Sequence, residues 1–185
     1  MDDKLLGGKW EMAVGSVLIP ASLLGDITPN YAEGLYEVET QAGTRKQPNG
    51  KAETAEMTFT LYLPSIDYLK VLFSEAYNAP SGTQKTGNII FGSNSCSTIS
   101  PLPINLHPVC EDNDNNDIHI YAGLINASFN PSLTTGEVVS IETTIFMQPT
   151  ANGYIRLGTG DTTQESHYDV ASQTTKPGKI VESES

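Results

Sequence analysis

The residues best suited to chemistry in this sequence are carboxylates, and several lie close together. One asparagine-rich run contains Glu111, Asp112, Asp114 and Asp117. Clustered carboxylates bind calcium, but an EF-hand loop beginning at Asp112 needs glycine at its sixth position and glutamate at its twelfth. Those places hold Asp117 and Gly123. We therefore interpret the run as a solvated acidic turn before a strand.

Two further carboxylate pairs, Glu37 with Glu39 and Glu53 with Glu56, have the short spacing of acid/base partners. Acid/base chemistry needs two carboxyl groups in differently tuned environments. A polar sheet face explains both pairs without such tuning, because few exposed acids are catalytic. We interpret all four residues as sheet-surface groups.

Other catalytic or metal-binding patterns are missing from the sequence. His107, His119 and His167 are scattered, with no H-E-x-x-H spacing, and neither G-x-S-x-G nor a phosphate-binding loop occurs. Cys96 and Cys110 do not form a C-x-x-C pair, so we expect free thiols. We predict no catalytic residue, no metal site and no cofactor, and hence no enzyme.

The length of 185 residues suits one hydrophobic core. The net charge is −12, from 22 acidic and 10 basic residues, and most of such a surface repels the phosphate backbone of DNA. This charge argues against a conventional nucleic-acid binder, whereas a channel that passes DNA without holding it should present carboxylates and neutral polar groups. No stretch approaches the roughly 20 apolar residues of a membrane span, and no secretory signal is present, so we expect a soluble cytosolic chain.

Apolar and polar residues alternate along several segments, which predicts a mainly β fold. In residues 53–63 the odd positions carry the apolar set Ala55, Met57, Phe59, Leu61 and Leu63, and the even positions are polar. Residues 36–41 and 137–148 repeat this design. Shorter strands are predicted at residues 10–19, 88–91, 104–109 and 154–157. We predict a β domain over residues 1–158 and a mobile or extended polar C-terminal tail over residues 159–185.

Residues 118–129 change the phase of their alternation near Gly123, which predicts a β-bulge there. This strand and residues 137–148 should form a long hairpin. Residues 65–77 have helical spacing of apolar side chains, which predicts one amphipathic helix packed on a sheet. Residues 42–52 are rich in glycine, proline and basic side chains, and we expect a long extended loop there.

This order of elements resembles the tail tube proteins of long-tailed bacteriophages, a fold also used by the tube protein of type VI secretion. The resemblance rests on a two-faced strand at residues 53–63, a single helix after it, and the closing hairpin over residues 118–149. It covers about residues 10–158. It implies a small β-barrel or sandwich with one flanking helix, assembled into hexameric rings that stack into a hollow tube.

The resemblance also implies roles for named residues. The positions that match an acidic and polar lumen are Glu37, Glu39, Glu56, Thr58, Thr60, Glu142 and Thr144. The loop at residues 42–52 corresponds to one that reaches the neighbouring ring, with Arg45, Lys46 and Lys51 as contacts. Implied partners are copies of the chain, a tape-measure protein and other tail proteins, with transient passage of DNA and no membrane. The implied location is the virion tail, assembled in the cytoplasm of a host bacterium.

Two alternatives stay open at this stage. The chain could be a secretion-tube subunit or another ring or decoration component of a virion, such as a neck protein. It could also be a soluble β-sandwich module that binds a ligand such as a carbohydrate. Trp10 is the only tryptophan, and the sequence has no aromatic cluster typical of a sugar-binding platform.

Overall fold

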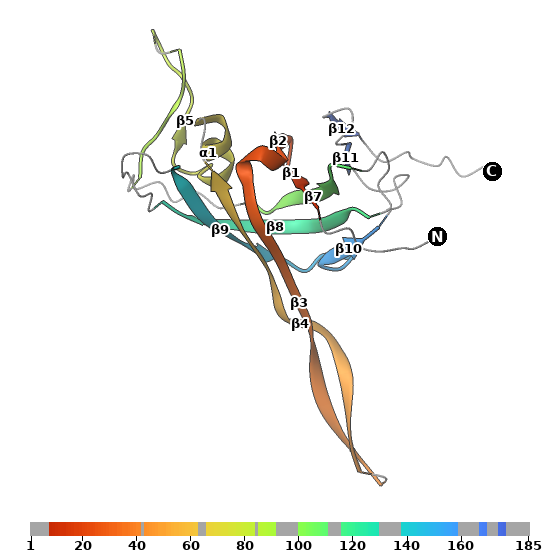
Figure 1. Ribbon diagram of the computed structural model, residues 1–185. Helices are drawn as coiled ribbons and strands as arrows, with labels where there is room; N and C mark the ends of the chain where they lie inside the picture. Colours follow the sequence, from red (N-terminus) through yellow and green to blue (C-terminus); the bar gives the residue numbers. More distant parts are fainter. Residues whose placement is uncertain are drawn as a thin grey trace, which may run out of the picture.

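The computed structural model shows a β-rich body from which a long two-stranded arm projects (Figure 1). The structure describes residues 8–41, 43–62, 66–83, 85–91, 100–110, 116–129, 138–158, 167–169 and 174–176. The strands are β1 (Trp10–Val14), β2 (Val17–Ile19), β3 (Leu24–Thr40), β4 (Gly43–Tyr62), β5 (Tyr77–Asn78), β6 (Asn88–Ile89), β7 (Leu102–Pro108), β8 (Ile118–Ser128), β9 (Ser140–Met147), β10 (Ile155–Leu157), β11 (His167–Asp169) and β12 (Thr174–Lys176). A 3-10 helix, η1 (Ala21–Leu23), and an α-helix, α1 (Ile66–Leu72), complete the elements.

Eight strands form one sheet in the order β2, β1, β7, β8, β9, β4 and β3, with β10 also beside β8. Every pairing in it is antiparallel. The predicted mainly β class is confirmed. The sheet runs open from β2 to β3 and is not closed into a barrel within one chain.

The core lies on one face of this sheet, as the alternation of residues 53–63 predicts. Met57, Phe59 and Leu61 are buried on β4, while Thr58 between them is exposed. β9 supplies Ile141, Ile145 and Met147 to the same core. Leu63 and Glu137, at the margins of the predicted strands, lie outside the described residues.

The single helix is confirmed but is shorter than residues 65–77. α1 ends at Leu72, and Phe73 to Ala76 form turns that lead into β5. Val71 and Leu72 are buried in the core cluster, so the apolar stripe does pack on the sheet. No helix in the described part of the chain is long and apolar enough to cross a membrane.

The predicted bulge near Gly123 is present. Leu102 of β7 pairs with Gly123 and Ile104 pairs with Ile120, so two residues of β8 lie opposite one residue of β7. The extra residue reverses the face to which the following side chains point. Ile120 before the bulge and Ile125 after it are therefore both buried. The hairpin of β8 with β9 is also confirmed.

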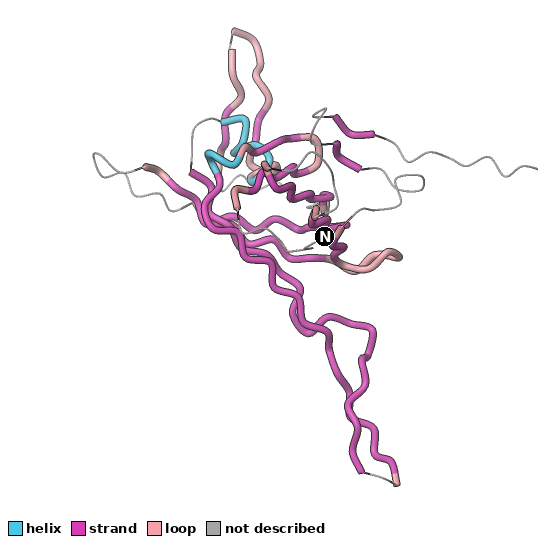
Figure 2. The backbone as a smooth tube through the Cα atoms, turned by 45° about the vertical axis from the view of Figure 1, so that its right-hand side comes forward, coloured by secondary structure: helices cyan, strands magenta, loops and turns pink. Residues whose placement is uncertain are grey.

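The extended loop expected at residues 42–52 is wrong. Residues 43–51 continue β4, and they pair with the second half of β3 in a register that ends at Thr40 and Gly43. A segment with this loop-like composition can still form a strand, because the backbone of β3 satisfies its hydrogen bonds. No side chain of the segment has to be buried for this pairing. Figure 2, turned from the view of Figure 1, shows the same paired arm leaving the body.

Two smaller differences concern the ends of the chain. The strand predicted over residues 10–19 is two strands, β1 and β2, joined by a turn at Gly15, whose φ of 58° favours glycine. Within the predicted polar tail, β11 and β12 pair with each other, and the other residues from 159 onward lie outside the described ones. The boundary between domain and tail stays a prediction.

Candidate assembly surface

The face of the sheet that points away from the core is polar over four adjacent strands, β3, β4, β9 and β8. The register aligns one cross-strand row of Thr28, Thr58, Thr144 and Asn126. A second row joins Thr60, Glu142 and Ser128. Asp26 lines the same shallow groove as these two rows. The alternation of each strand therefore combines into one continuous polar surface.

A third row extends this surface toward the arm. It contains Asn30, Glu56, Phe146 and Leu124. The three rows carry the carboxylates of Glu56 and Glu142, and Asp26 beside them adds a third; none of the residues in the rows is a lysine or arginine. We call the three rows together with Asp26 the polar face. Its carboxylates give it a negative charge, and its other side chains are mainly hydroxyls and amides.

The polar face brings together five of the seven residues predicted to line a lumen: Glu56, Thr58, Thr60, Glu142 and Thr144. The other two are elsewhere. Glu37 and Glu39 lie on the arm, where they pair in register with Lys46 and Thr44. Their inclusion rested on alternation alone, which does not reveal whether a strand belongs to the body or to a projection. The lumen role of all seven stays a prediction.

Five polar residues of the polar face were missed from the sequence: Asp26, Thr28, Asn30, Asn126 and Ser128. A signal was available for the last two, because they alternate with Ile125 and Ala127 after the bulge. Asp26 and Thr28 were harder to find. β3 is an edge strand with a register shift between Leu24 and Ile27, which obscures its alternation.

The arm is the part of β3 and β4 beyond the pair Glu33 and Ala52. Almost all of its side chains are exposed, and its strands are held by backbone pairing and weak surface contacts. Tyr36 Oη donates to Gln47 Oε1 over 2.9 Å, and Lys46 Nζ lies 3.9 Å from Glu37 Oε1. An exposed ion pair of this kind contributes little stability.

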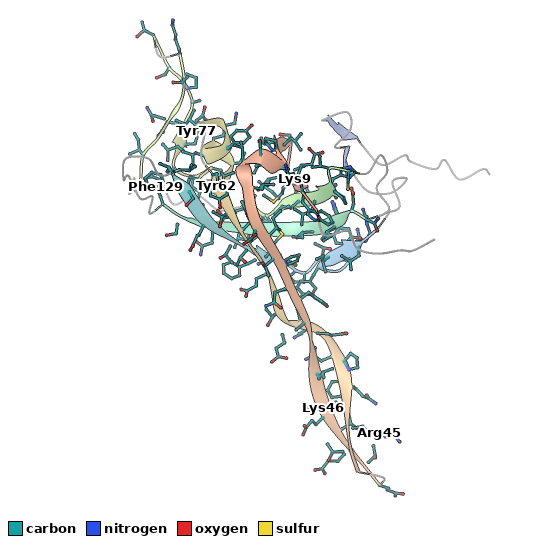
Figure 3. The ribbon with its side chains drawn as sticks, in the orientation of Figure 1. Lys9, Arg45, Lys46, Tyr62, Tyr77 and Phe129 are labelled. Carbon is teal, nitrogen blue, oxygen red and sulfur yellow. The ribbon has the colours of Figure 1, made fainter. Side chains whose placement is uncertain are left out.

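Of the three basic residues predicted to make inter-ring contacts, Arg45 and Lys46 lie near the far end of the arm (Figure 3). Lys51 lies near its root, where its backbone N–H donates to Asn49 Oδ1 over 2.8 Å. At the root, the ring centroids of Tyr31 and Tyr154 are 5.8 Å apart. This contact joins β3 to the segment before β10. The basic residues are therefore presented on a projection, and their contacts with another ring stay a prediction.

Among the residues that the structure describes, the sheet of the polar face has two unpaired edges. One is the outer edge of β3, which is the last strand of the sheet. The other is β8 from Leu124 to Ser128, which pairs only with β9 among the described residues because β7 begins opposite Gly123. Unpaired edges can pair with strands of another chain, so they are a liability unless an assembly covers them.

Asp117, expected in a solvated turn, is instead buried. Asn105 Nδ2 donates to Asp117 Oδ2 over 2.8 Å, and His107 Nδ1 lies 2.7 Å from Asp117 Oδ1. The register of β7 with β8 brings these residues together. Glu111, Asp112 and Asp114 lie outside the described residues. Within the described part, no group of three or more His, Cys, Asp or Glu side chains is arranged to bind a metal ion.

The two cysteines were expected to be free thiols. Cys110 is free and exposed in the structure. Cys96 lies outside the described residues, so its state stays a prediction.

Several solved structures share this fold. A chain of an extracellular contractile injection system, the PVC sheath–tube complex in its extended state, matches with a TM-score of 0.52 over 85% of this chain and 94% of its own. A chain of the anti-feeding prophage cap, described as a tube terminating cap, matches with a TM-score of 0.55 over 86% and 94%. A chain of the PVC sheath/tube terminator in its extended state matches with a TM-score of 0.50 over 84% and 99%. Sequence identity is 10% in each case.

No protein-family model matches the chain, and a search of curated proteins by sequence finds no match. The similarity at 10% identity therefore concerns the fold. A tube-like fold was predicted from the order of elements, and these neighbours support it. They come from contractile injection systems, so the specific resemblance to long-tailed phages stays a prediction. The chain has the fold found in components of contractile tube assemblies.

Proposed function

We propose that this chain is a non-enzymatic structural subunit that assembles with its own copies into rings, and that the rings stack into the hollow tube of a phage tail. The observation that carries the proposal is the polar face, a four-stranded sheet with one unpaired edge on each side. The fold shared with chains of tube-containing assemblies supports it.

The strand order explains how a ring can close. From β8 through β9 and β4 to β3 each strand is antiparallel to the next, so β8 and β3 run in opposite directions. A second copy related by rotation can therefore place its β8 edge along β3 in an antiparallel pairing. Repeating this contact around an axis covers both edges of the polar face. The number of six copies per ring comes from the resemblance to tail tube proteins.

In such a ring the polar face lines the lumen, because the other face of the sheet is the protein core. Asp26, Glu56 and Glu142 give the wall negative charge without neighbouring lysine or arginine. DNA phosphates are repelled by such a wall, and the threonine and asparagine side chains offer no fixed charge to hold them. The wall thus suits transient passage of a genome during delivery into the host.

The arm supplies contact between rings. It extends away from the body and presents Arg45 and Lys46 at its far end (Figure 3). The arm carries Arg45, Lys46 and Lys51 against Glu37 and Glu39, while the chain as a whole has a net charge of −12. The basic side chains of the arm therefore complement the acidic body of the next copy in a stack. A tape-measure protein and other tail proteins are the further partners of this assembly in the virion tail, formed in the cytoplasm of a host bacterium.

A second candidate is a tube or terminator subunit of a contractile injection system, one of the virion-like ring components considered from the sequence. The neighbours favour it, because they come from a sheath–tube complex, a tube terminating cap and a sheath/tube terminator. The two roles differ in assembly. A terminator forms rings that do not continue into long tubes, whereas a tube subunit stacks without limit.

Electron microscopy of the purified full chain tests the proposal. Rings and tubes with a central channel support a tube subunit, single or paired rings support a terminator, and a strict monomer at high concentration overturns both.

The lumen is tested with Thr58→Cys in a chain whose Cys96 and Cys110 are serine. In tubes this thiol should react with a small maleimide and resist a large polyethylene-glycol maleimide. Equal reaction with both reagents would reject a lumenal polar face.

A further inference from the structure

An aromatic cluster lies beside the unpaired edge of β8. The ring centroids of Phe73 and Phe91 are 5.1 Å apart, and those of Phe91 and Phe129 are also 5.1 Å apart. Phe91 is 49% exposed and Phe129 is 47% exposed. Three phenylalanines in contact, two of them half exposed, make an apolar surface of the kind that marks an interaction site.

The same surface continues into a groove on the core side of the β8 edge. The groove is lined by the end of α1, by Phe91 and by Ile125 and Ala127 of β8. The exposed carboxylate of Glu75 also lies at this groove. We call this surface the aromatic edge.

A second groove lies at the other unpaired edge, along β3. It separates the start of β1 from β3 and is lined by Lys9, Trp10, Ala21, Leu24 and Ile27, among others. β2 pairs with β1 only from Met12 to Val14, so Trp10 at this groove has no partner in β2. We call it the β3 groove. Figure 3 shows Phe129 at the left margin of the body and Lys9 on the other side of the upper part of β3.

We propose that the aromatic edge of one copy seats in the β3 groove of the next copy, as the outer layer of the ring contact. This inference rests on the proposed function, since it takes the pairing of β8 with β3 as its starting point. When β8 of one copy pairs with β3 of the next, the core-facing sides of the two strands lie next to each other. The aromatic edge of one copy therefore adjoins the β3 groove of the next. Phe91 and Phe129 then meet the apolar side chains of Trp10, Leu24 and Ile27 in the β3 groove, whose lining also includes the polar residues Asp26 and Thr28.

A pair of opposite charges can form across this contact. Lys9 is exposed at the β3 groove, beside the exposed carboxylate of Asp26, and Glu75 is exposed at the aromatic edge. A head-to-tail ring places the lysine of each copy near the glutamate of its neighbour. Contact between two aromatic edges across a two-fold axis would instead bring like carboxylates together, which is unfavourable. The occupant of the groove is therefore a second copy in the head-to-tail arrangement.

Cross-linking tests this placement directly. Lys9→Cys and Glu75→Cys are made in separate chains whose native cysteines are serine, and the chains are mixed during assembly. Oxidation should give disulfide-linked dimers of one chain of each kind. A matched pair, Lys9→Cys with Lys85→Cys, should give none. Absence of cross-links in mixtures that form rings would overturn the inference while leaving the proposed function intact.

Charge exchange gives a second, independent readout. Lys9→Glu and Glu75→Lys should each weaken assembly, and the two changes in one chain should restore it.

Phe91→Ala with Phe129→Ala should raise the concentration needed for assembly by at least about tenfold, as expected for truncated aromatic anchors. Circular dichroism of the dissociated chains checks that the variants fold. If wild type forms rings and all variants assemble equally well, the contact is elsewhere; if wild type forms no rings, the proposed function fails.

Discussion

His107 Nδ1 of β7 lies 2.7 Å from Asp117 Oδ1, just before β8, and their side chains are 14% and 8% exposed. Asp117 also accepts a hydrogen bond from Asn105, and its backbone oxygen accepts one from the N–H of Gly158. Asp117→Ala should therefore lower the free energy of unfolding by about 2 kcal/mol, because buried donors lose their acceptor. Urea unfolding followed by Trp10 fluorescence measures this.

A matched control for Asp117 is Glu53→Ala, which removes an exposed carboxylate from β4. Its effect should stay within about 0.5 kcal/mol. If the two variants unfold at the same urea concentration, the buried network does not stabilise this end of the sheet.

The packing around Gly123 leaves no room for a side chain. A Cβ there would lie 2.5 Å from Ile104 Cδ1 and 2.8 Å from Ile145 Cγ2. The Ile104 methyl can rotate away, but Cγ2 of Ile145 is fixed on its branched carbon. Gly123→Ala should cost about 1–3 kcal/mol of unfolding free energy, as overpacking does. Gly8→Ala, with no atom within 4 Å of the added carbon, is the control and should leave thermal unfolding unchanged.

The sequence was informative wherever one face of a strand is buried. The alternation around Met57 and the phase change at Gly123 both reflect burial against a core, and the structure has both features. The arm has no buried face, so Pro48 and Gly50 indicated a loop although long-range pairing makes a strand. Asp117 was misread because its partners come from another strand. The unpaired edges could not be predicted, because they depend on the order of strands in the sheet. The alternation of apolar and polar residues along a strand carries no information about that order.

Thr143 places a hydroxyl oxygen in the apolar core. Its hydroxyl is buried on the core side of β9, the residue is 2% exposed, and the oxygen has no hydrogen-bond partner among the described residues. A buried hydroxyl without a partner is unfavourable. Thr143→Val keeps the shape and should raise the free energy of unfolding by about 1 kcal/mol. Thr58→Val on the exposed face should change it by less than about 0.5 kcal/mol. Destabilisation by Thr143→Val would indicate that the hydroxyl has a role in folding.

The basic residues of the arm should control stacking. Arg45→Glu, Lys46→Glu and Lys51→Glu together should leave rings intact and abolish tubes, because the arm would then repel the acidic body of the next ring. Electron microscopy counts rings and tubes, and tubes of the wild type should shorten as salt screens the attraction. Lys85→Glu reverses an exposed lysine outside the arm and serves as the control. Undiminished tubes in the triple variant would remove these residues from the inter-ring contact.

Excision of the arm removes its length and its basic residues together. Glu33 pairs with Ala52, so replacing residues 34–51 with Asn-Gly should close β3 and β4 with a two-residue turn. The body should lose about 1 kcal/mol or less, because an isolated two-stranded hairpin is only marginally stable and this one buries no core side chain. Rings should form without stacking.

A shorter excision completes the argument about the arm. Val38 pairs with Arg45, so replacing residues 39–44 with Asn-Gly shortens the arm while keeping Arg45, Lys46 and Lys51. If charge alone joins the rings, this variant stacks like wild type; if reach is also needed, its tubes are fewer and shorter. We expect the second result, because the removed segment is the part of the arm farthest from the body. Tubes of normal length from the full excision would show that rings stack through the body and would reject the arm as the link between them.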